Sequence, residues 1–186
     1  MDNIEQIKLL CALSLAPLEH VAKEGPKKNN LSIPIDCSTL ADLEALYSNR
    51  YKAIFNIKYN ITGPALYWFE IESQTETRCI IENINKYKLV SGYKAVPAIR
   101  KSINHDTKIL YVGKVKRDLW GRIVQHLGFY HVNRTQGLQL VHWCSGLDLN
   151  LILHIYEFED EMAGLMPIIE NGMAKHLNPL LGKHLK

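Results

Sequence analysis

The stretch ILYVGKVKRDLWGRIVQH, residues 109–126, decides the fold expected for this chain. Residues 109–112 are a short apolar run with one aromatic member, which predicts a strand, and a glycine and a basic turn follow it. Leu119, Ile123 and Leu127 then recur every four residues. This spacing gives a helix one apolar face, so we expect the helix to pack on the sheet that contains the strand.

Polar side chains around this unit are placed to bind an anion together. Arg122 and His126 lie four residues apart, so they project from one face of the helix. Tyr111 belongs to the strand, and Lys114 follows its glycine. Converging donors of this kind suit a phosphate group. The alternative is that Arg122 pairs with Asp118 one turn earlier and that His126 is a solvated helix residue.

The composition fits one globular domain, alone or with an elaborated flank. The chain has 186 residues, 47% of them hydrophobic, and a formal net charge of +3, which permits nucleic-acid binding but does not argue for it. Its four cysteines are scattered and lack metal-ligand spacing, as expected for reduced thiols in a cytoplasmic protein. No apolar run approaches the ~18–20 residues of a membrane span, and charged residues interrupt the apolar N-terminus, so we expect neither a span nor a signal peptide.

Periodicity along the rest of the chain predicts helices and short strands. We expect helices over residues 2–16, 39–47, 77–88 and 167–177. We expect strands over residues 31–35, 52–59, 66–71, 138–143 and 149–158. The first helix should end before Pro17, and the strand at 31–35 should lie at a sheet edge because Pro34 cannot donate to a ladder.

The order of these motifs resembles the GIY-YIG nucleases over about residues 65–182. The second half of the family name corresponds to Tyr111-Val112-Gly113. The first half corresponds to Ala65-Leu66-Tyr67, where the family usually has glycine and isoleucine before the tyrosine. Arg122 matches the helix arginine of the family, and His126 falls where the family carries a histidine or a tyrosine. The resemblance therefore implies that these residues form a nuclease active site.

The resemblance also implies a metal ligand. The metal-binding glutamate of the family corresponds to Glu170, with Pro179 downstream, and Lys114 falls at a position that is often basic. Glu170 independently lies at the margin of the apolar face of its helix, where a carboxylate loses solvation unless a cation or donor meets it. A lone carboxylate with water and phosphate oxygens suits Mg²⁺ or Mn²⁺. The alternative is an ion pair with Lys175 or Lys114.

The two tyrosines have a chemical interpretation and a structural one. Neighbouring strands lie about 4.8 Å apart, so Tyr67 and Tyr111 on one face would bring both hydroxyls near a single phosphate. A phenol with a pKa of about 10 is a poor base unless nearby positive charge lowers that pKa. Lys114 and a metal ion are the candidates to supply this charge. The alternative is that both tyrosines are packing residues with satisfied hydroxyls.

Two features depart from the family pattern. Residues 72–108 separate the two tyrosine motifs, so we expect an insertion at about 73–107 that is too long for a hairpin turn and acts in recognition. The family often has an asparagine shortly after the closing proline, where this chain has Gly182, and Asn178 lies nearby but out of register. The basic residues expected to contact DNA are Lys94, Arg100 and Lys101 in the insertion and Lys116 and Arg117 in the turn after the second tyrosine motif.

The resemblance implies an α+β fold with a small, mostly antiparallel sheet flanked by helices. Residues 1–60 are expected to form a mostly helical N-terminal extension and residues 61–186 the nuclease-like domain. The implied activity is Mg²⁺- or Mn²⁺-dependent hydrolysis of double-stranded DNA, in a self-contained restriction-type endonuclease with a homodimer as one state to test. Tyr67, Tyr111 and His126 are the candidate bases. The alternatives are a repair or mobile-element nuclease and a non-catalytic module that binds nucleic acid or protein.

Overall fold

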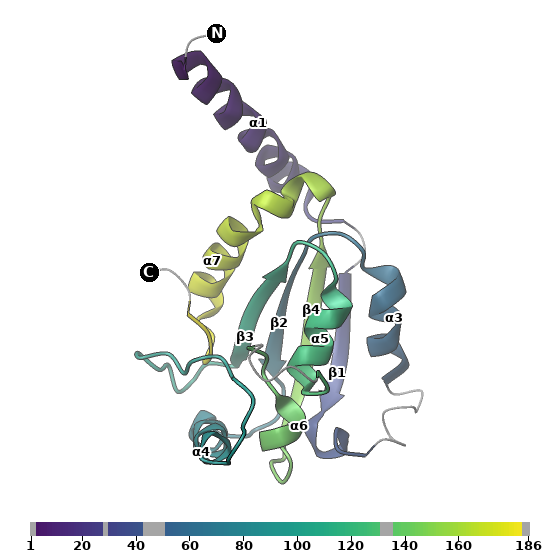
Figure 1. Cartoon of the computed structure of the whole chain (residues 1–186), viewed down its shortest axis with the longest axis vertical. Helices are drawn as coiled ribbons and strands as arrows, with labels where there is room; N and C mark the ends of the chain where they lie inside the picture. The colour runs from purple at the N-terminus through teal and green to yellow at the C-terminus, as the bar shows by residue number, and fades with distance from the viewer. Residues whose placement is uncertain (1–2, 28–29, 43–50, 131–135, 184–186) are drawn as a thin grey trace.

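The computed structural model describes residues 3–27, 30–42, 51–130 and 136–183. These residues form a four-stranded antiparallel sheet with helices on both faces (Figure 1). The strand order is β1-β4-β2-β3. The strands are β1 (Asn30–Asp36), β2 (Ala65–Ile71), β3 (Ile109–Val115) and β4 (Asn150–Glu157). The expected α+β class, with an antiparallel sheet flanked by helices, is confirmed.

Six α-helices and two short 3₁₀ helices are described beside the sheet. They are α1 (Asn3–Glu24), η1 (Cys37–Thr39), α3 (Lys52–Asn60), α4 (Thr77–Lys88), α5 (Leu119–Leu127), α6 (Leu140–Trp143), η3 (Asp160–Gly164) and α7 (Met166–Leu177). The helices expected at 77–88, after Asp118 and from Pro167 to Leu177 are confirmed, as are the strands near 31–35, 66–71, 109–112 and 149–158. β1 is an edge strand, as Pro34 predicted.

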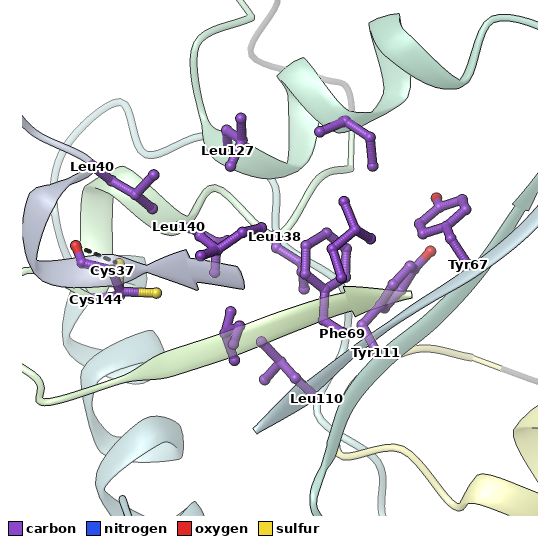
Figure 2. Close-up of a cluster of buried hydrophobic side chains, with 14 of the residues drawn as sticks. Cys37, Leu40, Tyr67, Phe69, Leu110, Tyr111, Leu127, Leu138, Leu140 and Cys144 are labelled. Carbon is purple, nitrogen blue, oxygen red and sulfur yellow. Dashed lines mark hydrogen bonds between the residues drawn. The ribbon is translucent and has the colours of Figure 1, made fainter. Parts of the chain in front are cut away.

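Two apolar cores lie on opposite faces of the sheet. The larger one packs the sheet against α3, α5 and α6, and Figure 2 shows part of it around Phe69, Leu127 and Leu138. The smaller one lies under α7 and includes Leu66 and Val112. The expected alternation along β4 is present, because it buries every second side chain. β2 and β3 are therefore covered on both sides.

Residues 30–42 and 51–60 share this larger core. β1 pairs with β4 along its whole length, and Ile33 and Ile35 are buried in the larger core. Ile54 and Ile57 of α3 join the same core, and Phe55 of α3 contacts Trp120 of α5 with ring centroids 5.6 Å apart. The segment placed in an N-terminal extension by sequence thus completes the sheet. By contrast, α1 projects away from the sheet (Figure 1).

The first helix was expected to end before Pro17, and this was wrong. α1 continues through Pro17 to Glu24, and the residues after the proline pack against the smaller core through Leu18 and Val21. Tertiary contacts of this kind can offset the ~3 kcal/mol that an interior proline costs a helix. None of the helices that the structure describes combines the length and hydropathy that a bilayer span needs.

Two strands expected from the sequence are helical. Residues 52–60 form α3, because Ile54 and Ile57 are buried three positions apart, which is a helical and not a strand spacing. Residues 140–143 form the short helix α6, and Gln139 before it has a left-handed backbone with φ +57°, which ends any extended run. Of the helix expected over 39–47, residues 43–47 lie outside the described part of the chain.

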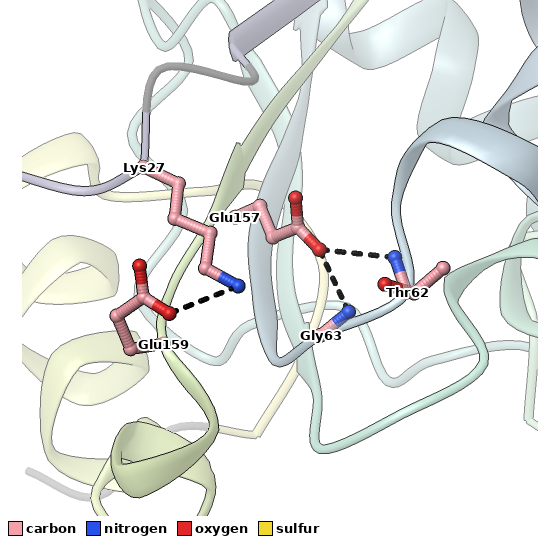
Figure 3. A network of polar contacts seen from close by, with 5 residues as sticks. All are labelled: Lys27, Thr62, Gly63, Glu157 and Glu159. Carbon is pink, nitrogen blue, oxygen red and sulfur yellow. Dashed lines mark hydrogen bonds and ion pairs between the residues drawn. The ribbon is translucent and has the colours of Figure 1, made fainter.

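A buried carboxylate fixes the start of β2 (Figure 3). Glu157 is 2% exposed, and its Oε1 accepts hydrogen bonds from the backbone N–H groups of Thr62 at 3.0 Å and Gly63 at 2.7 Å. Position 63 has no room for a side chain, since a Cβ there would lie 2.9 Å from the carbonyl oxygen of Phe158. The loop before β2 is therefore held against the end of β4. This contact sets where Tyr67 lies in the sheet.

We expect Glu157→Gln to lower the free energy of unfolding by about 1–3 kcal/mol in urea titrations, because a neutral amide accepts the two backbone hydrogen bonds less strongly. The matched control is Glu159→Gln. Glu159 pairs with Lys27 at 3.1 Å, but its side chain is 55% exposed, so its loss should cost less than about 1 kcal/mol. Equal losses in the two variants would contradict this role for the backbone contacts.

Candidate functional site

Four of the expected site residues meet on the face of the sheet that α5 covers. Tyr67 comes from β2 and Tyr111 from the neighbouring strand β3, while Arg122 and His126 come from α5. Tyr67 and His126 are fully buried, and Tyr111 is 9% exposed. The rings of Tyr111 and His126 have centroids 5.0 Å apart. The two tyrosine motifs are thus neighbours in space despite the insertion between them in sequence.

The glycine of the second motif makes room for the tyrosine of the first. Gly113 is the partner of Tyr67 in the β2–β3 register. A Cβ at Gly113 would lie 2.5 Å from Tyr67 Oη and 2.7 Å from Tyr111 Cε1, which are distances that real side chains do not tolerate. The Tyr67 ring therefore lies across the backbone of β3 and reaches α5. Any larger residue at position 113 would displace it.

Arg122 contacts both tyrosine hydroxyls. Its Nε donates to Tyr67 Oη at 3.2 Å, and its Nη2 donates to Tyr111 Oη at 3.3 Å. Its Nη1 donates to Gln125 Oε1 at 2.9 Å and to the carbonyl oxygen of Gln136 at 2.6 Å. A guanidinium has five N–H groups, so among the described residues one has no acceptor, on the Nη2 that also binds Tyr111. Arg122 thus joins the two tyrosine hydroxyls, while the expected convergence of these groups on a phosphate stays a prediction.

The alternative ion pair between Arg122 and Asp118 is wrong. Asp118 precedes α5 with a left-handed backbone, and its carboxylate accepts a hydrogen bond from the backbone N–H of Gly121 at 2.9 Å. This is an N-cap contact, which satisfies one of the free N–H groups at the start of the helix. Asp118 therefore fixes where α5 begins, and Arg122 binds the tyrosine hydroxyls instead of Asp118.

His126 is held as a neutral ring that donates to Tyr67. The backbone N–H of Leu138 donates to His126 Nδ1 at 3.1 Å, so Nδ1 carries no proton. Burial and the positive charge of Arg122 keep the pKa of His126 well below its usual range. The proton of the neutral ring is therefore on Nε2, which lies 2.9 Å from Tyr67 Oη. The alternative of a solvated helix histidine is wrong.

The Tyr67 oxygen accepts two hydrogen bonds, from Arg122 and from His126. Burial raises the pKa of Tyr67 above its ordinary value, the neighbouring Tyr111 adds to this effect, and the charge of Arg122 opposes it. Tyr67 consequently keeps its own proton at neutral pH. Its chemical character here is that of a neutral phenol held in place by two donors.

Lys114 and Glu170 take no part in the hydrogen bonds of this cluster, and Glu170 is carried by α7, on the face of the sheet opposite α5. β3 is the edge strand on this side of the sheet, and α7 packs on it. Burial raises the pKa of Glu170, and the charges of Lys114 and Arg122 oppose that effect. In the described part of the chain no hydrogen bond or ion pair joins Glu170 to another residue, so neither alternative ion pair, with Lys175 or Lys114, is present.

A metal ion at this edge would rely on one protein carboxylate. The described residues contain no group of three His, Cys, Asp or Glu side chains that could hold an ion. Glu170 is half-buried, partly desolvated and near two cationic side chains. A hard cation that keeps most of its water, such as Mg²⁺ or Mn²⁺, fits a single carboxylate of this kind when phosphate oxygens complete its shell.

The five basic residues expected to bind DNA divide into two groups. Lys94 Nζ donates to the carbonyl oxygens of Gly128 at 3.0 Å and Tyr130 at 2.7 Å, so it ties the insertion to the end of α5. Arg100 Nη1 donates to Asn178 Oδ1 at 2.9 Å, which gives Asn178 a structural contact at the end of α7. The remaining three residues, Lys101, Lys116 and Arg117, are exposed.

Three partners of the cluster were missed from the sequence. Gln125 lies three residues from Arg122 on the same helix, and this spacing was a usable signal. The carbonyl of Gln136 and the backbone N–H of Leu138 also bind the cluster. Backbone groups that arrive from a distant loop leave no mark in side-chain identity, so no sequence pattern could have identified them.

Gly113→Ala tests this arrangement. We expect a loss of about 1–3 kcal/mol in the free energy of unfolding, because the added methyl group overlaps Tyr67 and breaks its contacts with Arg122 and His126. The control is Gly172→Ala in α7, where a Cβ meets nothing within 4 Å, so the variant should gain about 0.5–1 kcal/mol. Urea titration measures both, and a neutral Gly113→Ala variant would contradict the geometry.

Comparisons of the chain with protein-family models, with curated protein sequences and with solved structures gave no match. A function for the chain therefore has to rest on the chemistry of the cluster around Tyr67, Tyr111 and Arg122. The relevant properties are its donors, its buried phenols and the carboxylate at its edge.

Proposed function

We propose that this protein is a divalent-metal-dependent endonuclease that hydrolyses phosphodiester bonds in double-stranded DNA. The observation that carries the proposal is the contact of Arg122 with both tyrosine hydroxyls, next to the desolvated carboxylate of Glu170. Phosphodiester hydrolysis needs a cation for the charge that develops on phosphorus-bound oxygens, an acid–base group and a metal ligand. The cluster contains a candidate for each role.

The substrate-facing side of the cluster is the edge formed by Arg122 Nη2 and Tyr111. The other N–H groups of Arg122 are directed at protein acceptors. Tyr111 is partly accessible, whereas Tyr67 is fully buried. A phosphate approaching this edge would receive the remaining N–H of Arg122 and would lie beside the Tyr111 hydroxyl. We infer that Tyr111 contacts the substrate and that Tyr67 positions Arg122.

This arrangement narrows the choice of general base. His126 has both ring nitrogens engaged, since Nδ1 accepts from Leu138 and Nε2 donates to Tyr67. Tyr67 has a raised pKa and no exposed surface from which to reach a water molecule. A base must lie within hydrogen-bond reach of the proton that it takes. Tyr111 is therefore our candidate base.

Glu170 would hold the metal ion, Mg²⁺ or Mn²⁺, near Lys114 and the Arg122 edge. A divalent cation bound there would supply positive charge to the phosphate oxygens. The protein side chains have separate tasks. Arg122 stabilises the charge that develops during attack, and Lys114 holds a phosphate oxygen. The exposed Lys101, Lys116 and Arg117 are the residues available to follow a DNA backbone.

A second candidate function is a non-catalytic module that binds nucleic acid or protein. The engagement of four of the five Arg122 N–H groups by protein acceptors and the complete burial of Tyr67 favour it, because both observations also fit residues that stabilise the fold. Within the enzyme proposal, a site-specific restriction-type enzyme is our preferred form. Repair and mobile-element nucleases are the other forms, and the pattern of cleavage separates them.

Incubation of the purified protein with plasmid and phage DNA, with Mg²⁺ or with EDTA, tests the proposed function. We expect metal-dependent cleavage, with discrete fragments if the enzyme is site-specific and fragments of all sizes if it is not. Glu170→Gln should abolish cleavage and preserve DNA binding in gel-shift titrations, because it removes the anionic ligand and little volume. Glu161→Gln, at an exposed position before α7, is the control and should cleave normally.

Intact DNA with the wild-type protein, combined with retained DNA binding, would favour the binding module. Cleavage by Glu170→Gln at the wild-type rate and metal concentration would remove Glu170 from the proposed role.

A further inference from the structure

The outer part of α1 is an apolar helix that the rest of the described chain does not cover. α1 has 22 residues and none of them is buried. Leu18 and Val21 pack on the smaller core, and the preceding turns of α1 project away from the sheet (Figure 1). Ile4 and Ile7 are 63% and 60% exposed, and Leu10 is 57% exposed. A continuous row of exposed aliphatic side chains is typical of a surface that contacts another molecule.

The exposed residues continue the stripe by which α1 binds its own body. Ile4, Ile7, Cys11, Ser14, Leu18 and Val21 follow one another at alternating spacings of three and four residues, which places them on one side of the helix. The last two pack on the smaller core. Around the same stripe the structure has an apolar groove, lined by Ile7, Leu10, Cys11, Ser14, Leu15 and Leu18 of α1 with Leu165 and Ile168 near the start of α7.

We propose that this groove binds α1 of a second copy of the chain, in an antiparallel and two-fold symmetric pair. Side-chain size along the stripe supports a self-complementary contact. The outer end has the large Ile4 and Ile7, and the middle has the small Cys11 and Ser14. Antiparallel pairing places the large residues of one copy opposite the small residues of the other, and each helix tip reaches Leu165 and Ile168 of its partner. Two-fold pairs use the same surface on both copies in this way.

Charge argues against other occupants of the groove. Over residues 3–16 the charged side chains are Glu5 and Lys8, and they pair with each other at 2.7 Å. This segment has no basic face for phosphates, so it suits neither DNA nor an anionic lipid surface. Its zero net charge also means that two copies do not repel each other. A second copy of the same helix carries the same neutral apolar stripe, so it is complementary to this surface.

The size of the contact predicts a modest affinity. Fourteen residues of helix are ~21 Å long and, with side chains, ~10 Å wide. Two such faces together with the α7 groove would bury an area at the low end of the range for specific protein–protein interfaces. We therefore expect a dimer that forms at micromolar concentration and dissociates on dilution. This inference does not depend on nuclease activity.

Sedimentation velocity of the full chain tests the proposal with two double variants. Ile7→Glu with Leu10→Glu places charges in the groove, so it should weaken dimerisation by at least ~100-fold and give a monomer. Leu9→Glu with Leu13→Glu changes exposed leucines on the opposite side of the same helix and should remain dimeric like the wild type. Circular dichroism checks that both variants keep their helix content.

A second measurement uses Cys11, which is exposed, while Cys37 and Cys144 are buried and Cys79 is half-buried. A short bismaleimide should cross-link the wild type into covalent dimers, and Cys11→Ser should not cross-link. A wild type that stays monomeric, or a groove variant that stays dimeric, would overturn the proposal. A monomer that cosediments with phosphatidylcholine vesicles would also overturn it, because a lipid surface would then be the occupant of the helix.

Discussion

The structure depends on the hydroxyl of Tyr67, which joins the sheet to the helix that covers it. This oxygen accepts hydrogen bonds from Arg122 and His126, and it can reach α5 because Gly113 leaves the adjacent strand without a side chain. The contact requires the correct register of β2, which Glu157 secures from the end of β4. Burying a phenol next to a cation costs free energy unless the phenol oxygen is hydrogen-bonded. The burial of Tyr67 therefore requires that β2, β3 and α5 come together in this arrangement.

The same bonds define how much of the cluster is left for chemistry. Protein acceptors engage most of Arg122, and both nitrogens of His126 have partners. Among the described residues, one N–H of Arg122 has no protein acceptor, and Tyr111 keeps 9% of its surface exposed. In the proposed enzyme these groups would form the reactive edge, and the buried contacts would hold them in position before substrate arrives.

Sequence identified the parts of this arrangement that are local. The spacing of Leu119, Ile123 and Leu127 located α5, and the four-residue separation of Arg122 and His126 placed them together. Non-local contacts decided the rest. α1 passes through Pro17 because Leu18 and Val21 pack beyond it, and residues 52–60 are helical because of what they bury. The backbone N–H of Leu138, which sets the proton position on His126, has no sequence signature.

Nitrogen-15 NMR of the histidine rings tests whether His126 is a neutral donor to Tyr67. The His126 signals are identified among the eight histidines by their loss in His126→Gln. Because burial and Arg122 lower the pKa of His126, we predict that its ring stays neutral, with the proton on Nε2, through the pH range in which ordinary histidines become protonated. A ring that becomes doubly protonated near its ordinary pKa, or that carries its proton on Nδ1, would contradict the account.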